Sequence, residues 1–150
     1  MFGMPLDKAK YVDVITMCEL ERDIEILPAG DLTEIGEKGI NLSGGQKARI
    51  SLARAVYANK DIFLMDDPIS AVDANVRNKL MKNVILGSLK GKTRVLVTHA
   101  IEFLHLADRI ILMHSGRIIC QGSYHDLRDH EQLQNLIKIN QLNTQKKYKA

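Results

Sequence analysis

The sequence contains few cysteines and no long apolar run, and both features limit the classes of protein to which it can belong. Cys18 and Cys120 are the only cysteines, and they stand far apart without a CxxC pattern. Such isolated thiols are typical of reduced, cytosolic proteins. No apolar run reaches the roughly 18 residues that a membrane-spanning helix requires. The N-terminus has no basic segment followed by an apolar stretch, so the sequence does not indicate a signal peptide. We therefore expect the isolated chain to be cytosolic.

The chain also has little net charge. Its 21 basic and 18 acidic residues give a formal charge of +3, and both signs are interspersed. This balance gives no support to a nucleic-acid partner or to binding at a membrane surface. With 150 residues, of which 45% are hydrophobic, the chain has enough apolar material for one domain or part of one.

A phosphate-binding loop of the GxxxxGK[ST] type is also missing. The nearest match, "GSLKGKT" at Gly87–Thr93, has three intervening residues rather than four. A phosphate loop follows a strand and opens a helix. This segment follows an expected helix and opens an expected strand, so it is interpreted as a turn.

Short apolar runs alternate with helical patterns along the chain, which predicts an α/β fold with a mostly parallel sheet flanked by helices. The first two expected strands are continuous apolar runs, which suit a sheet covered on both faces. The last two strands, separated by "HSG", are expected to form a hairpin, and the basic tail 144–150 is expected to be mobile. Helices are expected at 7–20, 46–59 and 74–86, with two short ones within 123–140; strands at 61–65, 93–98, 109–113 and 117–121; and a loop at 27–45.

Two adjacent carboxylates, Asp66 and Asp67, follow the first expected strand. Ligands of parallel α/β sheets bind beyond the carboxyl ends of the strands. One carboxylate there can hold Mg²⁺, which prefers oxygen ligands and keeps several waters, while the other orients an attacking water. The alternative is an acidic turn before Pro68, which blocks extension of the strand.

A glycine-rich helix start lies at "NLSGGQKARISLARAVY", Asn41–Tyr57. Ser43 and Gln46 match a capping box, which is the purely structural explanation. It does not account for Gly44 and Gly45, since each glycine in a helix costs about 1 kcal/mol relative to alanine. Bare N–H groups at a helix start bind anions, so a phosphate is expected to approach here, with Lys47 one turn further on.

The rest of this helix is expected to be ordinary. Its apolar stripe (Ile50, Ala53, Val56 and Tyr57) should be core, and Arg49 and Arg54 should face solvent or a partner.

One histidine stands out by its position. His99 directly follows the second expected strand, at the sheet edge where the paired carboxylates should lie. A histidine there can hydrogen-bond a terminal phosphate and respond to its loss. The other histidines show no metal-ligand spacing and are interpreted as structural: His105, His114, His125 and His130.

Together these segments resemble the nucleotide-binding domain of ABC transporters. Ser43–Gln46, within "LSGGQ", match the signature motif, and "IFLMDD" at Ile62–Asp67 looks like the Walker B strand. "SAVD" at Ser70–Asp73 resembles the D-loop, and "VTH" at Val97–His99 the switch-histidine loop. The resemblance covers nearly the whole chain. It is greatest to the first nucleotide-binding domain of the C subfamily, the multidrug-resistance-associated exporters.

The resemblance implies roles for these residues. Ser43, Gly44 and Gly45 would contact the γ-phosphate of ATP held by a second nucleotide-binding domain, because these domains pair head to tail. Gln46 would help to hold that loop. Asp73 would lie at the pair interface and couple the two sites.

On the chain's own side, the resemblance implies that Asp66 helps to bind Mg²⁺ and that His99 contacts the γ-phosphate. Asp67 stands where the family's general base is usually glutamate. Its side chain is one methylene shorter, roughly 1.5 Å, and a displacement of about 1 Å can cost about 100-fold in rate. The resemblance therefore implies a site that binds ATP firmly and hydrolyses it poorly.

The resemblance also implies that the N-terminal core of the domain, including its phosphate loop, precedes Met1. Residues 1–140 would then be a partial P-loop NTPase domain, roughly its C-terminal two-thirds. In it, 1–59 would form the helical signature region and 60–140 the Walker B and histidine-loop core, and 141–150 would be a basic tail or linker. Without the missing strand, backbone groups and an apolar face of the sheet should be uncovered, so the chain alone is expected to be marginally folded or to aggregate. It is also expected to show no measurable ATPase activity.

Three functions remain open at this stage. The first is an ATP-driven module of an exporter of small molecules, joined to transmembrane domains at the cytosolic face of a membrane. The second is a non-catalytic fragment or regulatory half-site that lends its signature loop to a partner's ATP. The third, a soluble ABC ATPase of DNA repair or translation, is disfavoured because no coiled-coil heptads or basic insertion interrupt the signature region.

Overall fold

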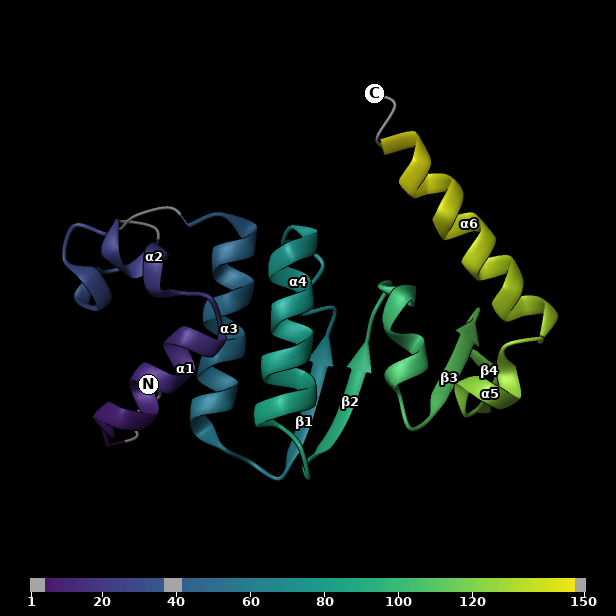
Figure 1. Cartoon of the computed structure of the whole chain (residues 1–150), viewed down its shortest axis with the longest axis horizontal. Helices are drawn as coiled ribbons and strands as arrows, with labels where there is room; N and C mark the ends of the chain where they lie inside the picture. Colours follow the sequence, from purple (N-terminus) through teal and green to yellow (C-terminus); the bar gives the residue numbers. More distant parts are fainter. Residues whose placement is uncertain (1–4, 37–41, 148–150) are drawn as a thin grey trace. The chain divides into compact units, whose positions relative to one another are not determined.

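The computed structural model describes residues 5–36 and 42–147. The chain divides into two compact units, Met1–His99 and Ala100–Ala150 (Figure 1). The first unit contains, in chain order, α1 (Lys8–Met17), α2 (Glu21–Glu25), the 3₁₀ turn η1 (Gly30–Leu32), α3 (Gly44–Ala58), β1 (Ile62–Asp66), α4 (Ala74–Leu80), the π-helical η2 (Met81–Ser88) and β2 (Thr93–Val97). The second contains the 3₁₀ helix η3 (Ile101–Leu106), β3 (Ile110–His114), β4 (Arg117–Gly122), α5 (Tyr124–Leu127) and α6 (Glu131–Lys147).

The expected strands and long helices are present, and the expected parallel pairing is confirmed for the first two strands. β1 pairs with β2 in parallel, with Leu64 opposite Val95 and Asp66 opposite Val97. β3 and β4 form the expected antiparallel hairpin. Ser115 and Gly116 both have positive φ, of 48° and 75°, as a tight two-residue hairpin turn requires. The "GSLKGKT" segment is confirmed as a turn from η2 into β2.

Other expectations were incomplete. The short helix α2 and the 3₁₀ helices η1 and η3 occupy segments that were expected to be loop or were left unassigned. The last helix was expected to end by Asn140 but continues to Lys147, because no glycine or proline interrupts it. Residues 37–41 of the expected loop and the tail residues 148–150 lie outside the described residues.

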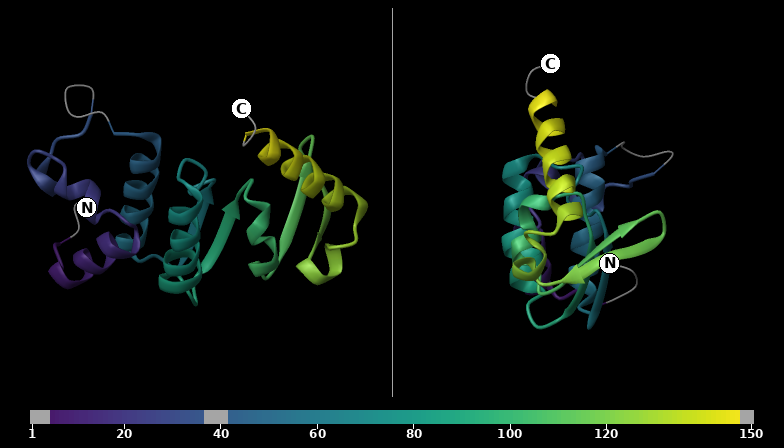
Figure 2. Two further views of the ribbon diagram at one scale, coloured as in Figure 1. Left: turned by 45° about the horizontal axis from the view of Figure 1, so that its top comes forward. Right: turned by 90° about the vertical axis from the view of Figure 1, so that its right-hand side faces the viewer.

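The β1–β2 sheet is covered on one face only by the described residues. Continuous apolar strands suit two covered faces, whereas the exposed apolar face agrees with the expectation that part of the sheet is left uncovered in this chain. Phe63 and Met65 are buried, and Arg94 reaches the carbonyl oxygen of Ile85 in η2 at 2.6 Å. The continuous helix of α4 and η2 therefore lies over this face (Figures 1 and 2). The opposite face carries four exposed apolar side chains: Ile62, Leu64, Val95 and Val97, which are 51–79% exposed.

The ends of α1 are closed by side chains and by a helix-stop motif. At its start, Tyr57 of α3 accepts a hydrogen bond from the Asp7 N–H and donates one to the Pro5 carbonyl oxygen, each at 2.8 Å. At its end, the Leu20 N–H bonds to the Ile15 carbonyl oxygen and the Glu19 N–H bonds to that of Thr16, a Schellman motif. Glu19 takes the left-handed position with φ of 55°, where glycine is usual.

The two cysteines differ in their environment. Cys18, at the end of α1, is fully buried, and burial raises the pKa of its thiol to about 12, although the positive charge of Arg49 opposes the shift. Cys120 in β4 is partly exposed. It packs beside the buried side chains of Ile110, Leu127 and Leu133, which form a core cluster of the second unit.

The uncovered face generates a prediction about self-association. Contiguous exposed apolar side chains favour association, and threonine preserves strand propensity while adding a polar group. We expect the paired substitutions Leu64→Thr and Val95→Thr to reduce association of the chain in sedimentation velocity while changing the thermal midpoint little. Phe63→Ala, on the covered face of the same strand, should instead cost about 3–5 kcal/mol. An unchanged sedimentation profile for the double variant would contradict this.

Candidate functional site

The paired carboxylates and the histidine lie at one edge of the β1–β2 sheet, as expected from parallel strands. Asp66 is the last residue of β1, and it lies opposite Val97 at the end of β2. Asp67 follows directly, and its N–H donates to the Val97 carbonyl oxygen at 2.8 Å, which extends the ladder by one bond. His99, exposed, follows two residues after β2. Strand pairing therefore brings the two short segments together.

Asp67 is held in an unusual backbone conformation. Its φ is 45°, in the left-handed region that aspartate tolerates better than most residues. The Ser70 hydroxyl donates to the Asp67 carbonyl oxygen at 2.9 Å, and Thr98 Oγ1 lies 3.5 Å from Asp67 Oδ1, at the outer limit of a hydrogen bond. Strained positions of this kind persist where the surroundings hold them, and they concentrate at functional sites.

The glycine-rich helix start has the expected capping box. The Ser43 hydroxyl accepts from the Gln46 N–H at 3.1 Å, and Gln46 Oε1 accepts from the Ser43 N–H at 2.8 Å. The first helical bond runs from the Lys47 N–H to the Ser43 carbonyl oxygen. The Gly44 and Gly45 N–H groups precede that bond, so the helix itself cannot satisfy them. Ser43 and Gly44 are exposed, and a phosphate fits against these donors.

The two glycines have different reasons to be glycine. A Cβ added to Gly45 would stand 2.8 Å from the carbonyl oxygen of Ala71, so the backbone after β1 itself occupies that space. A Cβ on Gly44 would meet only the Ala71 Cβ, at an ordinary 3.7 Å. Packing within the chain therefore explains Gly45, whereas it leaves Gly44 unexplained.

Asp73 has a local structural role. It is the N-cap of α4, and its Oδ1 accepts from the N–H groups of Asn75 and Val76 at 2.9 and 3.1 Å. The hydrogen bond from Val76 is the main cause that holds the pKa of Asp73 below its ordinary value. The carboxylate is exposed, so the capping role leaves it accessible from solvent.

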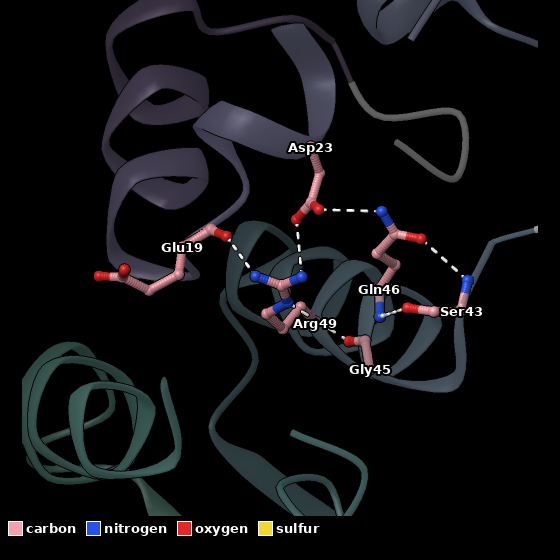
Figure 3. A network of polar contacts seen from close by, with 6 residues as sticks. All are labelled: Glu19, Asp23, Ser43, Gly45, Gln46 and Arg49. Atoms are coloured by element: carbon pink, nitrogen blue, oxygen red, sulfur yellow. Dashed lines mark hydrogen bonds and ion pairs between the residues drawn. The ribbon is translucent and has the colours of Figure 1, made fainter. Parts of the chain in front are cut away.

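Arg49 does not face solvent, so that alternative of the expectation was wrong. Its side chain and that of Asp23 are each only 15% exposed, and Nη2 of Arg49 forms an ion pair with Oδ2 of Asp23 at 2.8 Å (Figure 3). Arg49 Nη1 also donates to the Glu19 carbonyl oxygen at 2.7 Å, and Nε donates to that of Gly45 at 3.4 Å. The other oxygen of Asp23 accepts from Gln46 Nε2 at 2.9 Å. The helix start is thus fastened to α2 and to the end of α1.

Sequence reasoning missed Asp23 and Glu19 as parts of this site. Asp23 lies 23 residues before Gln46 and belongs to a five-residue helix without clear periodicity. Glu19 carries no turn signature, because glycine would be the expected residue at a positive φ.

Magnesium is supported by donor chemistry alone. Among the described residues there is no group of three histidine, cysteine or acidic side chains that could hold a metal. Asp66 offers one exposed carboxylate at the end of β1. A single carboxylate fits Mg²⁺, which is usually held by one or two carboxylates together with phosphates and water. Asp66 would therefore hold the ion only together with a nucleotide.

The geometry agrees with comparisons to known proteins. Residues 15–70 match the family model described as ABC transporter. Over 130 residues, 85% of this chain and 8% of the relative, the chain is 57% identical to ABC transporter C family member 8 of Dictyostelium discoideum. It is 56% identical over 128 residues to multidrug resistance protein mrp-7 of Caenorhabditis elegans, which covers 84% of this chain and 8% of that protein. It is 53% identical over 131 residues to ATP-binding cassette sub-family C member 2 of Mus musculus, with 86% and 8% covered.

The fold and the motifs therefore define a segment of an ABC transporter domain, of α/β type with a small parallel sheet. More specifically, the chain belongs with the C family of these transporters, which includes multidrug-resistance proteins. The chain spans 8% of the length of these three relatives.

No helix among the described residues is both long enough and apolar enough to cross a membrane.

The glycine asymmetry generates a prediction about stability. Gly45→Ala should cost about 1–3 kcal/mol, because its methyl group would overlap the Ala71 carbonyl oxygen. Gly44→Ala has room and should cost nothing, with a gain of up to about 1 kcal/mol from helix propensity. Urea unfolding of both variants checks this, and equal stabilities would contradict the assigned packing.

The Asp73 cap generates a prediction about pH. Because folding lowers its pKa below 3.8, the charged cap stabilises the fold above that pH and loses its effect as the pH falls through the folded-state pKa. Wild type should therefore unfold at higher urea than Asp73→Asn at about pH 6, and the two midpoints should converge as the pH falls below 3.8. Asp13→Asn, at an exposed site on α1, serves as the control. A gap that does not change with pH would contradict the prediction.

Proposed function

We propose that the chain is part of the nucleotide-binding module of a C-family ABC exporter, in which ATP drives transport of small molecules by attached transmembrane domains. Ser43, Gly44 and Gly45 contact the γ-phosphate of ATP bound by a second nucleotide-binding domain. One observation carries this proposal: Gly44 is exposed, has room for a Cβ at an ordinary contact distance from Ala71, and lies beside N–H groups that the helix cannot satisfy.

The remaining site residues complete the proposal. Gln46 holds the loop, as its contacts to Ser43 and Asp23 support. Asp66 binds Mg²⁺ together with the nucleotide, and His99 contacts the γ-phosphate on its own side of the pair. Asp73, whose exposed carboxylate caps α4, lies at the interface between the two domains.

Asp67 occupies the position of the general base. Its shorter side chain and its strained backbone support a site that holds ATP and turns it over slowly. This also supports a second candidate function, a half-site that contributes its signature segment to a partner's ATP without hydrolysis of its own. The two differ in ATP turnover by the assembled pair: loss of turnover in Asp67→Ala would favour the catalytic role, and unchanged turnover the half-site.

The contact with the phosphate can be tested by charge. Gly44→Asp places a carboxylate at a helix start, where it stabilises folding, but it would repel a γ-phosphate. Two like charges 4 Å apart interact by about 4 kcal/mol at an effective dielectric constant of about 20. We therefore expect the Kd between this chain and an ATP-loaded nucleotide-binding domain of a C-family relative to rise at least tenfold, or about 1.4 kcal/mol.

Gly44→Asn is the matched control, because it has the same size without the charge. It should weaken pairing less than Gly44→Asp, and the difference between the two should shrink at high salt. Equal pairing of wild type, Gly44→Asp and Gly44→Asn, with and without ATP, would overturn the proposed function.

A further inference from the structure

We propose that Asp23 is a positioning residue for the signature segment, Ser43–Gln46, and that it acts through Gln46 while Arg49 holds it in place. This inference rests on the proposed function. It goes further in assigning to α2 and the end of α1 the orientation of the loop that meets the nucleotide (Figure 3).

The capping box alone does not orient the segment. Ser43 and Gln46 close the start of α3 by bonding each other, and these bonds remain wherever the helix start lies relative to α2. Within residues 5–36 and 42–147, the side chains of the box bond outside it through the hydrogen bond from Gln46 Nε2 to Asp23 Oδ1. The amide orientation is fixed chemically, because its oxygen must accept from the Ser43 N–H and its nitrogen must donate to a carboxylate.

Asp23 is itself held firmly. Its second oxygen pairs with Arg49 at 2.8 Å, and both side chains are largely buried, which limits screening by solvent. The guanidinium also donates from Nη1 to the carbonyl oxygen of Glu19 and from Nε to that of Gly45, an arrangement of donors that only arginine supplies. The Asp23 link, meaning Asp23 with Gln46 and Arg49, therefore joins α2, α3 and the end of α1.

Glu19 extends this connection to α4. Its left-handed backbone aims the carbonyl oxygen at Arg49, while its carboxylate pairs with Lys79 Nζ at 2.7 Å. Glycine would suit the positive φ but could not make the contact to α4. A side chain retained at a strained position supports a role beyond ending the helix.

The test compares Asp23→Ala with a variant destabilised elsewhere on α3. Tyr57→Phe removes the hydroxyl that bonds Asp7 and Pro5 near the other end of the helix, and it leaves the Asp23 link intact. Pairing of the full chain with an ATP-loaded nucleotide-binding domain is measured well below both thermal midpoints, so that each variant is folded. We expect Asp23→Ala to raise the Kd about tenfold and Tyr57→Phe to leave it unchanged.

Hydrogen exchange supplies a readout that needs no partner. Asp23→Ala should speed exchange of the amides at Gly44–Gln46 relative to the rest of α3, whereas Tyr57→Phe should not. In a double-mutant cycle with Arg49→Ala, Asp23 and Arg49 should act as one unit. The Kd of the double variant should therefore rise about tenfold rather than a hundredfold.

The outcomes separate the two proposals. If wild type shows no ATP-dependent pairing, the proposed function is wrong, and the exchange experiment still decides whether Asp23 orders the segment. If wild type pairs and Asp23→Ala matches it in both Kd and exchange, the inference about Asp23 is wrong. Equal losses in Asp23→Ala and Tyr57→Phe would reduce Asp23 to a contributor to stability.

Discussion

The close approach of the Gly45 backbone to the Ala71 carbonyl oxygen is the contact on which the rest of the site depends. It lets the start of α3 lie directly against the segment that leaves β1. That segment is anchored at both ends, by the Ser70 bonds to the Asp67 carbonyl oxygen and by the Asp73 cap of α4. The helix start and the carboxylate edge of the sheet are therefore parts of one packed unit, so a shift at one must displace the other.

Local chemistry made much of this predictable from the sequence. The capping box of Ser43 and Gln46 needs only two side chains three residues apart, and it formed as expected. The parallel pairing of β1 and β2 followed from two short apolar runs with helical sequence between them, and the hairpin from a turn signature at Ser115 and Gly116. Features that depend on residues close together in the chain could therefore be predicted from the sequence.

Contacts between distant residues were not predictable in this way. Nothing local to Arg49 indicates that a carboxylate 26 positions earlier will draw it out of solvent, or that Glu19 will adopt a positive φ. Likewise, the continuous apolar pattern of β1 suits a strand covered on both faces, but it does not indicate which element supplies the cover. Leu64, 79% exposed, is the clearest instance. The comparisons supply the family, while the Asp23 link emerges only from the three-dimensional arrangement.

Because the two thiols differ in exposure, their rates of alkylation can report local opening of the chain. Only the thiolate attacks alkylating reagents, so Cys18, fully buried and with its pKa raised to about 12, is silent while α1 stays packed. Cys120 is partly exposed and serves as an internal reference in the same molecule. The rate at which Cys18 is alkylated therefore measures how often the C-terminal end of α1 opens. Arg49 donates a hydrogen bond to the Glu19 carbonyl oxygen at this end of α1. Loss of that contact would therefore increase alkylation of Cys18, a residue already present in the chain.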